Sequence, residues 1–281
     1  MRSVRVTWPV PAPQTPNEDN PRSAESLSTG RGRHDSLKTR MPHTRLYVEH
    51  RLGPGAELGL GVEAARYLGR VLRLKAGDVL SVFNGDDGEW HATILAIGKE
   101  RVALQVGEAL VTDTESALRI HLVQGISRGE RMDFVVQKAT ELGVERITPV
   151  LTDHGTVRLD AARAAKRRDH WQRVAQSACE QSGRTQPPQL DAPVALNTWF
   201  GDADGPGLIL VPGAASTLSE CTAPDAGLRL LIGPEGGFSE REYKDASLAG
   251  FLPVALGPRI LRTETAAVAA LAIVQSLWGD L

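Results

Sequence analysis

Residues 228–250, LRLLIGPEGGFSEREYKDASLAG, place a strand, a glycine-rich loop and the start of a helix in one continuous run. The strand covers residues 228–232, and Ser239 with Glu242 has the spacing of a capping box that begins the helix. Open α/β sheets bind ligands beyond the carboxyl ends of their strands, where glycines let the backbone approach a flat group closely. The loop at 233–237 is therefore a candidate binding site. It lacks the GK[ST] and GxGxxG patterns, and a plain tight turn is the simpler alternative.

A second loop of this kind lies at residues 256–266, LGPRILRTETA, between an apolar strand at 252–256 and the final helix. Arg262 falls just before that helix or in its first turn, where the helix dipole disfavours a cation unless negative charge develops nearby. A locally unfavourable residue of this kind predicts a functional site. The alternative is an arginine that merely pairs with Glu264 or with another neighbouring carboxylate.

Residues 117–281 are predicted to form an α/β domain. Apolar strands alternate with helices along this region, and the strands are expected at 119–123, 146–150, 207–211, 228–232 and 252–256. This alternation is typical of a mostly parallel sheet covered by helices. The last helix, 265–278, is rich in alanine and apolar nearly all round, so most of its surface must be buried. Burial against a second subunit would explain it and favours a homodimer.

Residues 41–112 are predicted to form a smaller β domain. The short apolar stretches LYV, DVLSVF, HATILAI and RVALQV are separated by NG and DG turns, which is the pattern of a small antiparallel barrel. One helix at 62–74 interrupts the strands and carries three arginines, Arg66, Arg70 and Arg73. A barrel with a basic helix suits contact with an RNA backbone, and a solvated helix face is the simpler alternative.

A further basic segment spans residues 158–184. It holds seven basic residues against three acidic ones, in a chain whose formal net charge is -2. The global charge argues against a protein that coats nucleic acid, so any such contact must come from local patches. The apolar stripe of this segment predicts a helix whose basic face could hold phosphates, with Arg184 in the following loop. Here too a solvated helix face is the alternative.

Several classes of protein are excluded by the remaining features. Cys179 and Cys221 are far apart and the histidines are scattered, so we predict neither a disulfide nor a metal site. No apolar run approaches the roughly 20 residues that cross a membrane, and the N-terminus lacks a secretory signal, which together predict a cytoplasmic protein. Residues 1–40 are predicted to be a disordered extension, and translation could begin at Met41.

Four ordered stretches of the chain resemble the RsmE family of RNA methyltransferases. They are GISRGERMDFVVQKATELGVERITPV at 125–150, WQRVAQSACEQSGRTQPPQL at 171–190, LLIGPEGGFSERE at 230–242 and LGPRILRTETAAVAAL at 256–271. Together they span most of residues 119–281, and residues 45–106 resemble the PUA-like RNA-binding domain of that family. Either loop alone would be only suggestive, whereas four motifs in this order and at this spacing are highly specific.

The resemblance implies a trefoil-knotted SPOUT methyltransferase domain, preceded by a small PUA-like β-barrel domain, in a homodimer. It implies S-adenosylmethionine as the methyl donor and N3 of a uridine in 16S ribosomal RNA as the target, either in free RNA or in the assembled 30S subunit. By similarity, the cofactor contacts carry over to three loops, which contain Leu210 and Pro212, then Gly233 and Gly236, then Leu256, Gly257, Ile260, Leu261 and Thr265.

The chemistry of this target limits the mechanism. Uridine N3 is an imide that holds its proton at neutral pH, so transfer requires removal of that proton or stabilisation of the developing anion. We predict Arg262 as the anion stabiliser and Glu264 as the base or its orienter. Three further arginines are candidate RNA contacts: Arg128, Arg131 and Arg184.

Two other functions fit the same residues. One is a SPOUT methyltransferase that acts on another RNA base or on a ribose 2′-hydroxyl, since target choice lies in the shape of the pocket. The other is a non-catalytic RNA-binding factor for ribosome assembly, against which the intact GPEGG and LRTETA motifs argue.

Overall fold

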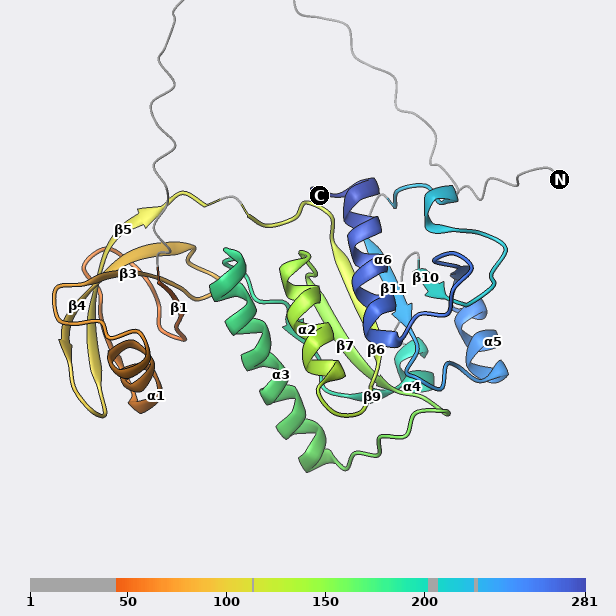
Figure 1. The fold of residues 1–281 in the computed structure, drawn as a ribbon, viewed down its shortest axis with the longest axis horizontal. Helices are drawn as coiled ribbons and strands as arrows, with labels where there is room; N and C mark the ends of the chain where they lie inside the picture. The colour runs from red at the N-terminus through yellow and green to blue at the C-terminus, as the bar shows by residue number, and fades with distance from the viewer. Residues whose placement is uncertain (1–43, 113, 202–206, 225–226) are drawn as a thin grey trace, which may run out of the picture.

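The computed structural model describes residues 44–112, 114–201, 207–224 and 227–281, which form two sheets with separate cores (Figure 1). The predicted disordered extension at 1–40 lies outside these residues. Among the described helices, none combines the length and the apolar character that a membrane span requires.

The first sheet has five strands in the order β1-β3-β4-β5-β2. Their bounds are β1 Arg45–Tyr47, β2 Glu57–Leu60, β3 Val79–Phe83, β4 Glu89–Ile97 and β5 Val102–Leu110. Alternate side chains such as Leu80, Val82, Ile94 and Leu104 are buried in one cluster, as the period-2 pattern requires. All pairs are antiparallel except β1 with β3, which run parallel. The expectation of a wholly antiparallel barrel is wrong at this pair, because the long connection after β1 lets the two strands run in one direction.

The helix expected at 62–74 is shorter than predicted. It consists of α1 (Val62–Arg66) and a π-helical turn, η1 (Tyr67–Val71), which buries Leu68 against the sheet. Arg66, Arg70 and Arg73 are exposed around this segment. Arg73 lies beyond the turn at a φ of 58°, in the left-handed region that glycine adopts more readily.

The second sheet has seven strands, all parallel, as the alternation of strands and helices predicts. Its order is β12-β10-β11-β6-β7-β8, and β9 pairs with β7. The bounds are β6 Ile120–Gly125, β7 Arg146–Leu151, β8 Gln189–Leu190, β9 Val194–Ala195, β10 Gly207–Leu210, β11 Leu228–Ile232 and β12 Phe251–Val254. The short strands β8 and β9 were not expected, since two residues give no readable period.

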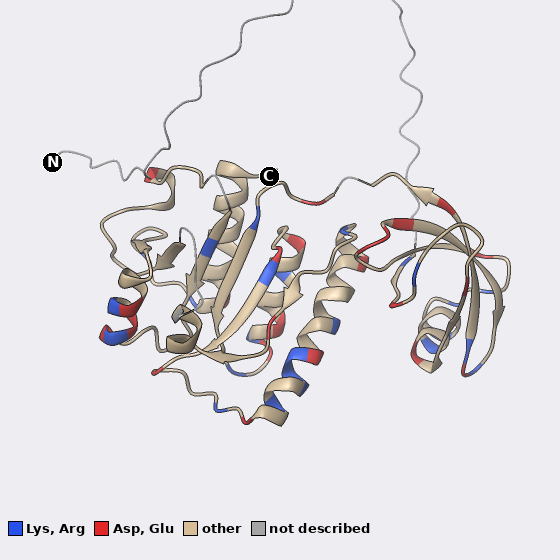
Figure 2. Ribbon diagram, turned by 180° about the vertical axis from the view of Figure 1, so that it is seen from behind, with Lys and Arg blue, Asp and Glu red and all other residues tan. Residues whose placement is uncertain are grey.

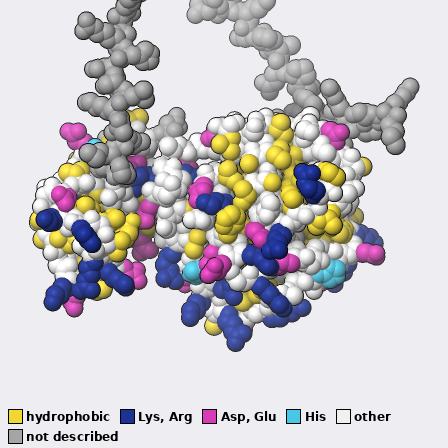
Figure 3. Space-filling model, viewed as in Figure 1, with side chains coloured by type: hydrophobic (Ala, Val, Ile, Leu, Met, Phe, Trp, Pro, Cys, Tyr) yellow, Lys and Arg dark blue, Asp and Glu magenta, His cyan; other side chains and the backbone are white. Residues whose placement is uncertain are grey.

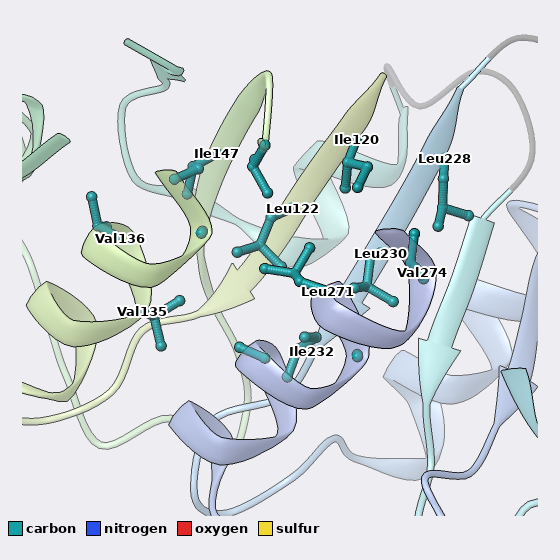
Figure 4. Close-up of a cluster of buried hydrophobic side chains, with 14 of the residues drawn as sticks. Ile120, Leu122, Val135, Val136, Ile147, Leu228, Leu230, Ile232, Leu271 and Val274 are labelled. Atoms are coloured by element: carbon teal, nitrogen blue, oxygen red, sulfur yellow. The ribbon is translucent and has the colours of Figure 1, made fainter. Parts of the chain in front are cut away.

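Helices cover both faces of this sheet. On one face lie α2 (Arg131–Glu141), α3 (Ala161–Ser182) and α6 (Thr263–Trp278), and on the other lie α4 (Leu196–Gly201) and α5 (Glu240–Leu248). Successive strand residues therefore enter different cores: Leu230 and Ile232 pack under α6 (Figure 4), whereas Leu231 joins the cluster of α5. A sheet buried on both faces explains why its strands are apolar throughout.

Because the strands are parallel, their carboxyl ends meet at one edge of the sheet. The loops after β6, β7, β10, β11 and β12 all leave from this edge, and α2, α3, α5 and α6 begin there. This edge brings together the two loops that were singled out in the sequence.

Candidate active site

A cavity of about 420 Å³ opens at the carboxyl ends of β10, β11 and β12. Its size lies within the range of pockets that hold small molecules, roughly 300–1,000 Å³. Four segments and two single side chains form its walls. The segments are residues 210–212, the glycine loop after β11, residues 254–261 at and after the end of β12, and the start of α6; the side chains are Arg131 of α2 and Tyr243 of α5. Both loops predicted from the sequence thus line one pocket.

Buried hydrogen bonds tie these loops together. The Thr263 hydroxyl, in the first turn of α6, donates to the carbonyl oxygen of Gly233 at 2.6 Å. The Gln124 side-chain amide, near the end of β6, donates to the same hydroxyl oxygen at 2.9 Å. Both side chains are at least 95% buried, so the bonds are shielded from water. Sequence reasoning missed this pair, although a glutamine at the end of an apolar strand was an available signal.

Gly125 allows the backbone of β6 to touch the glycine loop. A Cβ at Gly125 would lie 2.5 Å from the Pro234 nitrogen and 2.9 Å from the carbonyl carbon of Gly233, which is closer than real Cβ atoms approach. We expect Gly125→Ala to weaken cofactor binding at least tenfold and to lower the free energy of unfolding by roughly 1–3 kcal/mol, since overpacking forces the backbone to shift. Isothermal titration and urea denaturation measure the two effects.

Gly59 in β2 provides the matched control. A Cβ there meets nothing within 4 Å, so Gly59→Ala should leave both quantities close to wild type. Wild-type affinity and stability in Gly125→Ala would contradict the contact between β6 and the loop.

Seven of the nine predicted cofactor contacts line the cavity: Leu210, Pro212, Gly233, Leu256, Gly257, Ile260 and Leu261. Two do not. Gly236 is packed against the loop after β7, where a Cβ would lie 2.8 Å from the carbonyl oxygen of His154. Thr265 is exposed on the first turn of α6. These two positions were assigned by similarity of sequence, which does not specify the direction of a side chain on a helix or the packing of a loop.

The predicted catalytic residues both line the cavity, and they do not pair with each other. Arg262 is the N-cap of α6, as its place in the sequence predicted, and it is exposed. Within the described part of the chain it forms no ion pair, so the alternative of a merely structural pairing with Glu264 is not what the structure contains. One Glu264 oxygen lies 3.8 Å from Nε of Arg131, and the other is buried without a hydrogen-bond partner among the described residues.

Arg131 and Glu235 form the rim of the cavity. The Arg131 guanidinium pairs with the Glu235 carboxylate, which also accepts from the backbone N–H of Arg128 at 3.3 Å. Burial alone would raise the pKa of Glu235, but hydrogen bonds from its own backbone, Arg131 and Arg128 hold it below its ordinary value. Glu235 therefore stays ionised and anchors Arg131 beside Glu264. Among the described residues, no group of three or more His, Cys, Asp or Glu side chains is placed to hold a metal ion.

The six predicted RNA contacts occupy different environments. Arg66, Arg70 and Arg73 are exposed on the small domain, and Arg128 is exposed beside the cavity. Arg131 is partly buried in the rim described above. Arg184 is 5% exposed: it pairs with Glu115 at 2.7 Å and donates to the carbonyl oxygens of Thr140 and Val144 at 2.9 Å. Its assignment as an RNA contact does not fit this position, because its donors are already engaged inside the protein.

Arg184 therefore serves stability. We expect Arg184→Ala to lower the free energy of unfolding by about 3 kcal/mol, because Glu115 and two carbonyl groups lose their charged partner. Arg119→Ala is the control, since its ion pair with Glu145 is well exposed on both sides and should contribute little. Urea denaturation measures the free energy of unfolding of both variants. Equal values for Arg184→Ala and Arg119→Ala would contradict the structural role of Arg184.

Comparison with known proteins places the chain in a family. Residues 114–275 match the RNA methyltransferase domain, and residues 60–107 match the RNA methyltransferase PUA domain. Ribosomal RNA small subunit methyltransferase E of Buchnera aphidicola subsp. Schizaphis graminum is 35% identical over 247 residues, which cover 87% of this chain and 100% of that protein. Its counterpart from the Acyrthosiphon pisum subspecies is 34% identical over 84% of this chain and 94% of its own length.

A solved structure agrees with the relatives found by sequence. The crystal structure of ribosomal RNA small subunit methyltransferase E from Neisseria gonorrhoeae, bound to S-adenosylmethionine, is 38% identical. It superposes with a TM-score of 0.79 over 85% of this chain and 99% of that chain. The matches extend through both domains and include the two loops that line the cavity, so this chain belongs to the ribosomal RNA small subunit methyltransferase E family.

Proposed function

We propose that this protein transfers the methyl group of S-adenosylmethionine to N3 of a uridine in 16S ribosomal RNA. The observation that carries the proposal is the position of two side chains at one cavity: Arg262, which forms no ion pair among the described residues, and Glu264, which has one buried oxygen without a hydrogen-bond partner there. The Arg262 cation and this Glu264 oxygen are therefore available for a substrate. The relatives are named for methylation of small-subunit ribosomal RNA, and the Neisseria protein holds the methyl donor.

The cavity fits the proposed cofactor in size and in character. Its apolar walls come from residues such as Leu210, Leu256 and Leu261, which suit a planar base, and Gly257 has a φ of 103° with open space where a Cβ would stand. A backbone at such a position approaches a ligand closely. When bound, S-adenosylmethionine supplies an activated methyl group that carries its own positive charge.

The residues of the chain have separate tasks in the proposed reaction. Arg262 stabilises the negative charge that develops on the uracil ring as N3 attacks, because a cation fixed in advance needs no reorganisation. Glu264 accepts the N3 proton, directly or through an oriented water, at its unpartnered oxygen. Arg131 fixes Glu264 from the other side through the contact at 3.8 Å and is itself fixed by Glu235. The exposed Arg66, Arg70, Arg73 and Arg128 contact the RNA backbone.

We further propose a homodimer in which the chain is folded as a trefoil knot. Support for the dimer comes from α6, which is mostly apolar but leaves Ile273 and Leu277 37% and 45% exposed. Hydrophobic side chains form a band over this helix in Figure 3. Ile260, at the cavity, is 85% exposed, and a ligand or second subunit would cover it. The proposed domains are a PUA-like unit at 41–112 and a methyltransferase unit at 117–281, in a cytoplasmic protein.

A methylation assay tests the proposed function. Protein is incubated with labelled S-adenosylmethionine and either naked 16S ribosomal RNA or 30S particles from a strain that lacks this gene, and the product is mapped by mass spectrometry. We expect one methyl group on a uracil ring at N3. Label on a ribose, on another base or nowhere would contradict the proposal.

A further inference from the structure

Helix α3 presents a row of cations that the proposed reaction does not use. The helix contains five basic and two acidic residues, in a chain whose net charge is -2. Trp171, Ala175, Ala178 and Cys179 form its buried stripe. Lys166 and Arg173 project from the opposite side and are exposed, and Figure 2 shows basic residues concentrated along the first half of the helix.

Most of these cations are not neutralised locally. Arg168 pairs with Asp169 at 2.8 Å, and Arg163 lies 3.4 Å from Asp160. Lys166, Arg167 and Arg173 form no ion pair within the described part of the chain. Arg167 instead lies over the ring of Trp171, 5.9 Å from its centroid. Several unpaired cations on one helix repel one another, whereas a bound polyanion would neutralise them.

The row begins at the same edge of the sheet as the cavity. Helix α3 begins after β7 at the carboxyl edge of the sheet, so Lys166 and Arg167 lie at the same edge as the cavity loops. From Arg163 to Arg173 the helix rises by about 15 Å, given 1.5 Å per residue. That length is sufficient for contact with several successive phosphates of a nucleic-acid strand, whose charges are about 3.4 Å apart along the axis in a duplex.

The small domain continues the same surface. Segment α1 with η1 lies at the lower end of the small domain, on the side where α3 begins (Figure 1), and Lys and Arg side chains gather along this lower edge of both domains (Figure 3). Arg73, beyond the turn, is held at a φ that favours glycine. An arginine kept in an unfavourable backbone conformation on an exposed surface is a sign of function.

A buried junction joins the two domains. Arg45 in β1 pairs with Glu89 at 2.8 Å and donates to the carbonyl oxygens of Cys179, at the end of α3, and Arg184. The backbone N–H of Tyr47 donates to Glu180 at 3.0 Å. The side chains of Arg45 and Glu89 are 9% and 2% exposed, so these buried contacts hold the five-stranded sheet against the carboxyl end of α3. This junction therefore orients the basic residues of the small domain relative to those of α3.

We propose that Lys166, Arg167 and Arg173 of α3, together with Arg66, Arg70 and Arg73 of the small domain, form a track of two basic groups that binds the phosphate backbone of the RNA substrate. The inference rests on the proposed function. It adds a surface that binds the RNA backbone at positions distant from the reacting base. An acidic protein would also be attracted to such a row, but the row begins at the same edge of the sheet as a cavity that could hold a base, which favours RNA.

The test compares two double variants that each remove two positive charges. Lys166→Gln/Arg173→Gln alters the track. Arg119→Gln/Lys138→Gln is the control: Arg119 precedes β6 at the opposite edge of the sheet, and Lys138 lies near the end of α2 in a partly exposed ion pair with Glu141. Binding of 16S ribosomal RNA is measured by fluorescence anisotropy from about 0.05 to about 0.5 M salt. Each phosphate contact releases counterions, so the slope of log Kd against log salt is proportional to the number of contacts.

We expect the track variant to bind RNA about tenfold or more weakly at low salt, with a slope of log Kd against log salt shallower by about 1.5, because each lost contact removes roughly 0.7–0.9. Its S-adenosylmethionine affinity and its kcat at saturating RNA should match wild type. The charge-preserving Lys166→Arg/Arg173→Lys should keep the wild-type slope. Arg73→Gly should relax the backbone and raise the melting temperature, yet weaken RNA binding.

Three outcomes would overturn the track, and only one of them would also overturn the proposed function. If wild type methylates 16S ribosomal RNA but the track and control variants share one salt slope and one KM, the track is overturned and the function stands. If wild type neither binds nor methylates this RNA, both are overturned. An equal loss of slope in the control variant would show only the net charge acting and would also overturn the track.

Discussion

Replacing Arg262 by alanine is expected to lower kcat by at least about a hundredfold. The arginine sits at the N-cap of α6, where the helix dipole repels it, and no carboxylate among the described residues neutralises it. Its charge is therefore available for the anion that forms on the uracil ring. Removal of one preorganised charge stabiliser typically costs a factor of about 10²–10³, or 2.7–4 kcal/mol of barrier. Single-turnover methylation of 16S ribosomal RNA measures the effect.

The same variant should remain folded and bind the cofactor. The Arg262 side chain forms no capping hydrogen bond, so its loss leaves α6 intact, and most affinity for S-adenosylmethionine should be kept in a titration. Arg262→Lys keeps the charge without the planar donors and should retain part of the rate. A kcat near wild type in Arg262→Ala would remove this residue from the mechanism.

Glu264→Gln is expected to lower kcat by roughly a hundredfold as well, for a different reason. The substitution keeps the shape of the side chain but removes its ability to accept the N3 proton, and general base catalysis typically contributes 10²–10⁴-fold. The unpartnered oxygen of Glu264 is the acceptor on which the prediction rests. A pH–rate profile distinguishes this role: the rate of the variant should rise with pH as N3 loses its proton to hydroxide, more steeply than the rate of wild type.

A purely structural role for Glu264 predicts another pattern. Loss of its contact with Arg131 would then raise KM or weaken cofactor binding, while the shape of the pH profile would stay the same. Arg131→Gln is a useful comparison, because it removes that contact from the other side and leaves the carboxylate in place. Equal profiles for Glu264→Gln and wild type would contradict the base assignment.

The local parts of this fold could be predicted from the sequence because their signals lie within a few residues. The Ser239–Glu242 capping box forms as expected and starts α5 at Glu240. Arg262 caps α6, and the two glycine-bearing loops line one cavity because parallel strands place their carboxyl ends together. The assignment of the individual cofactor and catalytic residues stays a prediction until a ligand is observed.

The parts that failed depend on partners far along the chain. The sequence places Arg184 in a loop as a candidate RNA contact, yet the residue is buried because Glu115, 69 residues before it, supplies the opposite charge. The parallel pairing of β1 with β3 gives no signal in either strand, since alternation indicates which side of a strand is buried and not which strand lies beside it. The hydrogen bond between Thr263 and Gly233 joins residues that are 30 positions apart, so no local sequence pattern predicts it either.

A crystal structure of the protein soaked with S-adenosylmethionine tests the central claim most directly, which is that the loops after β11 and β12 form the site of the methyl donor. We predict one cofactor molecule per chain, enclosed by residues 210–212, Gly233 and residues 256–261, with its methyl group directed toward Arg262 and Glu264. Density for the cofactor at any other place, or none at a concentration that saturates methylation, would contradict the account.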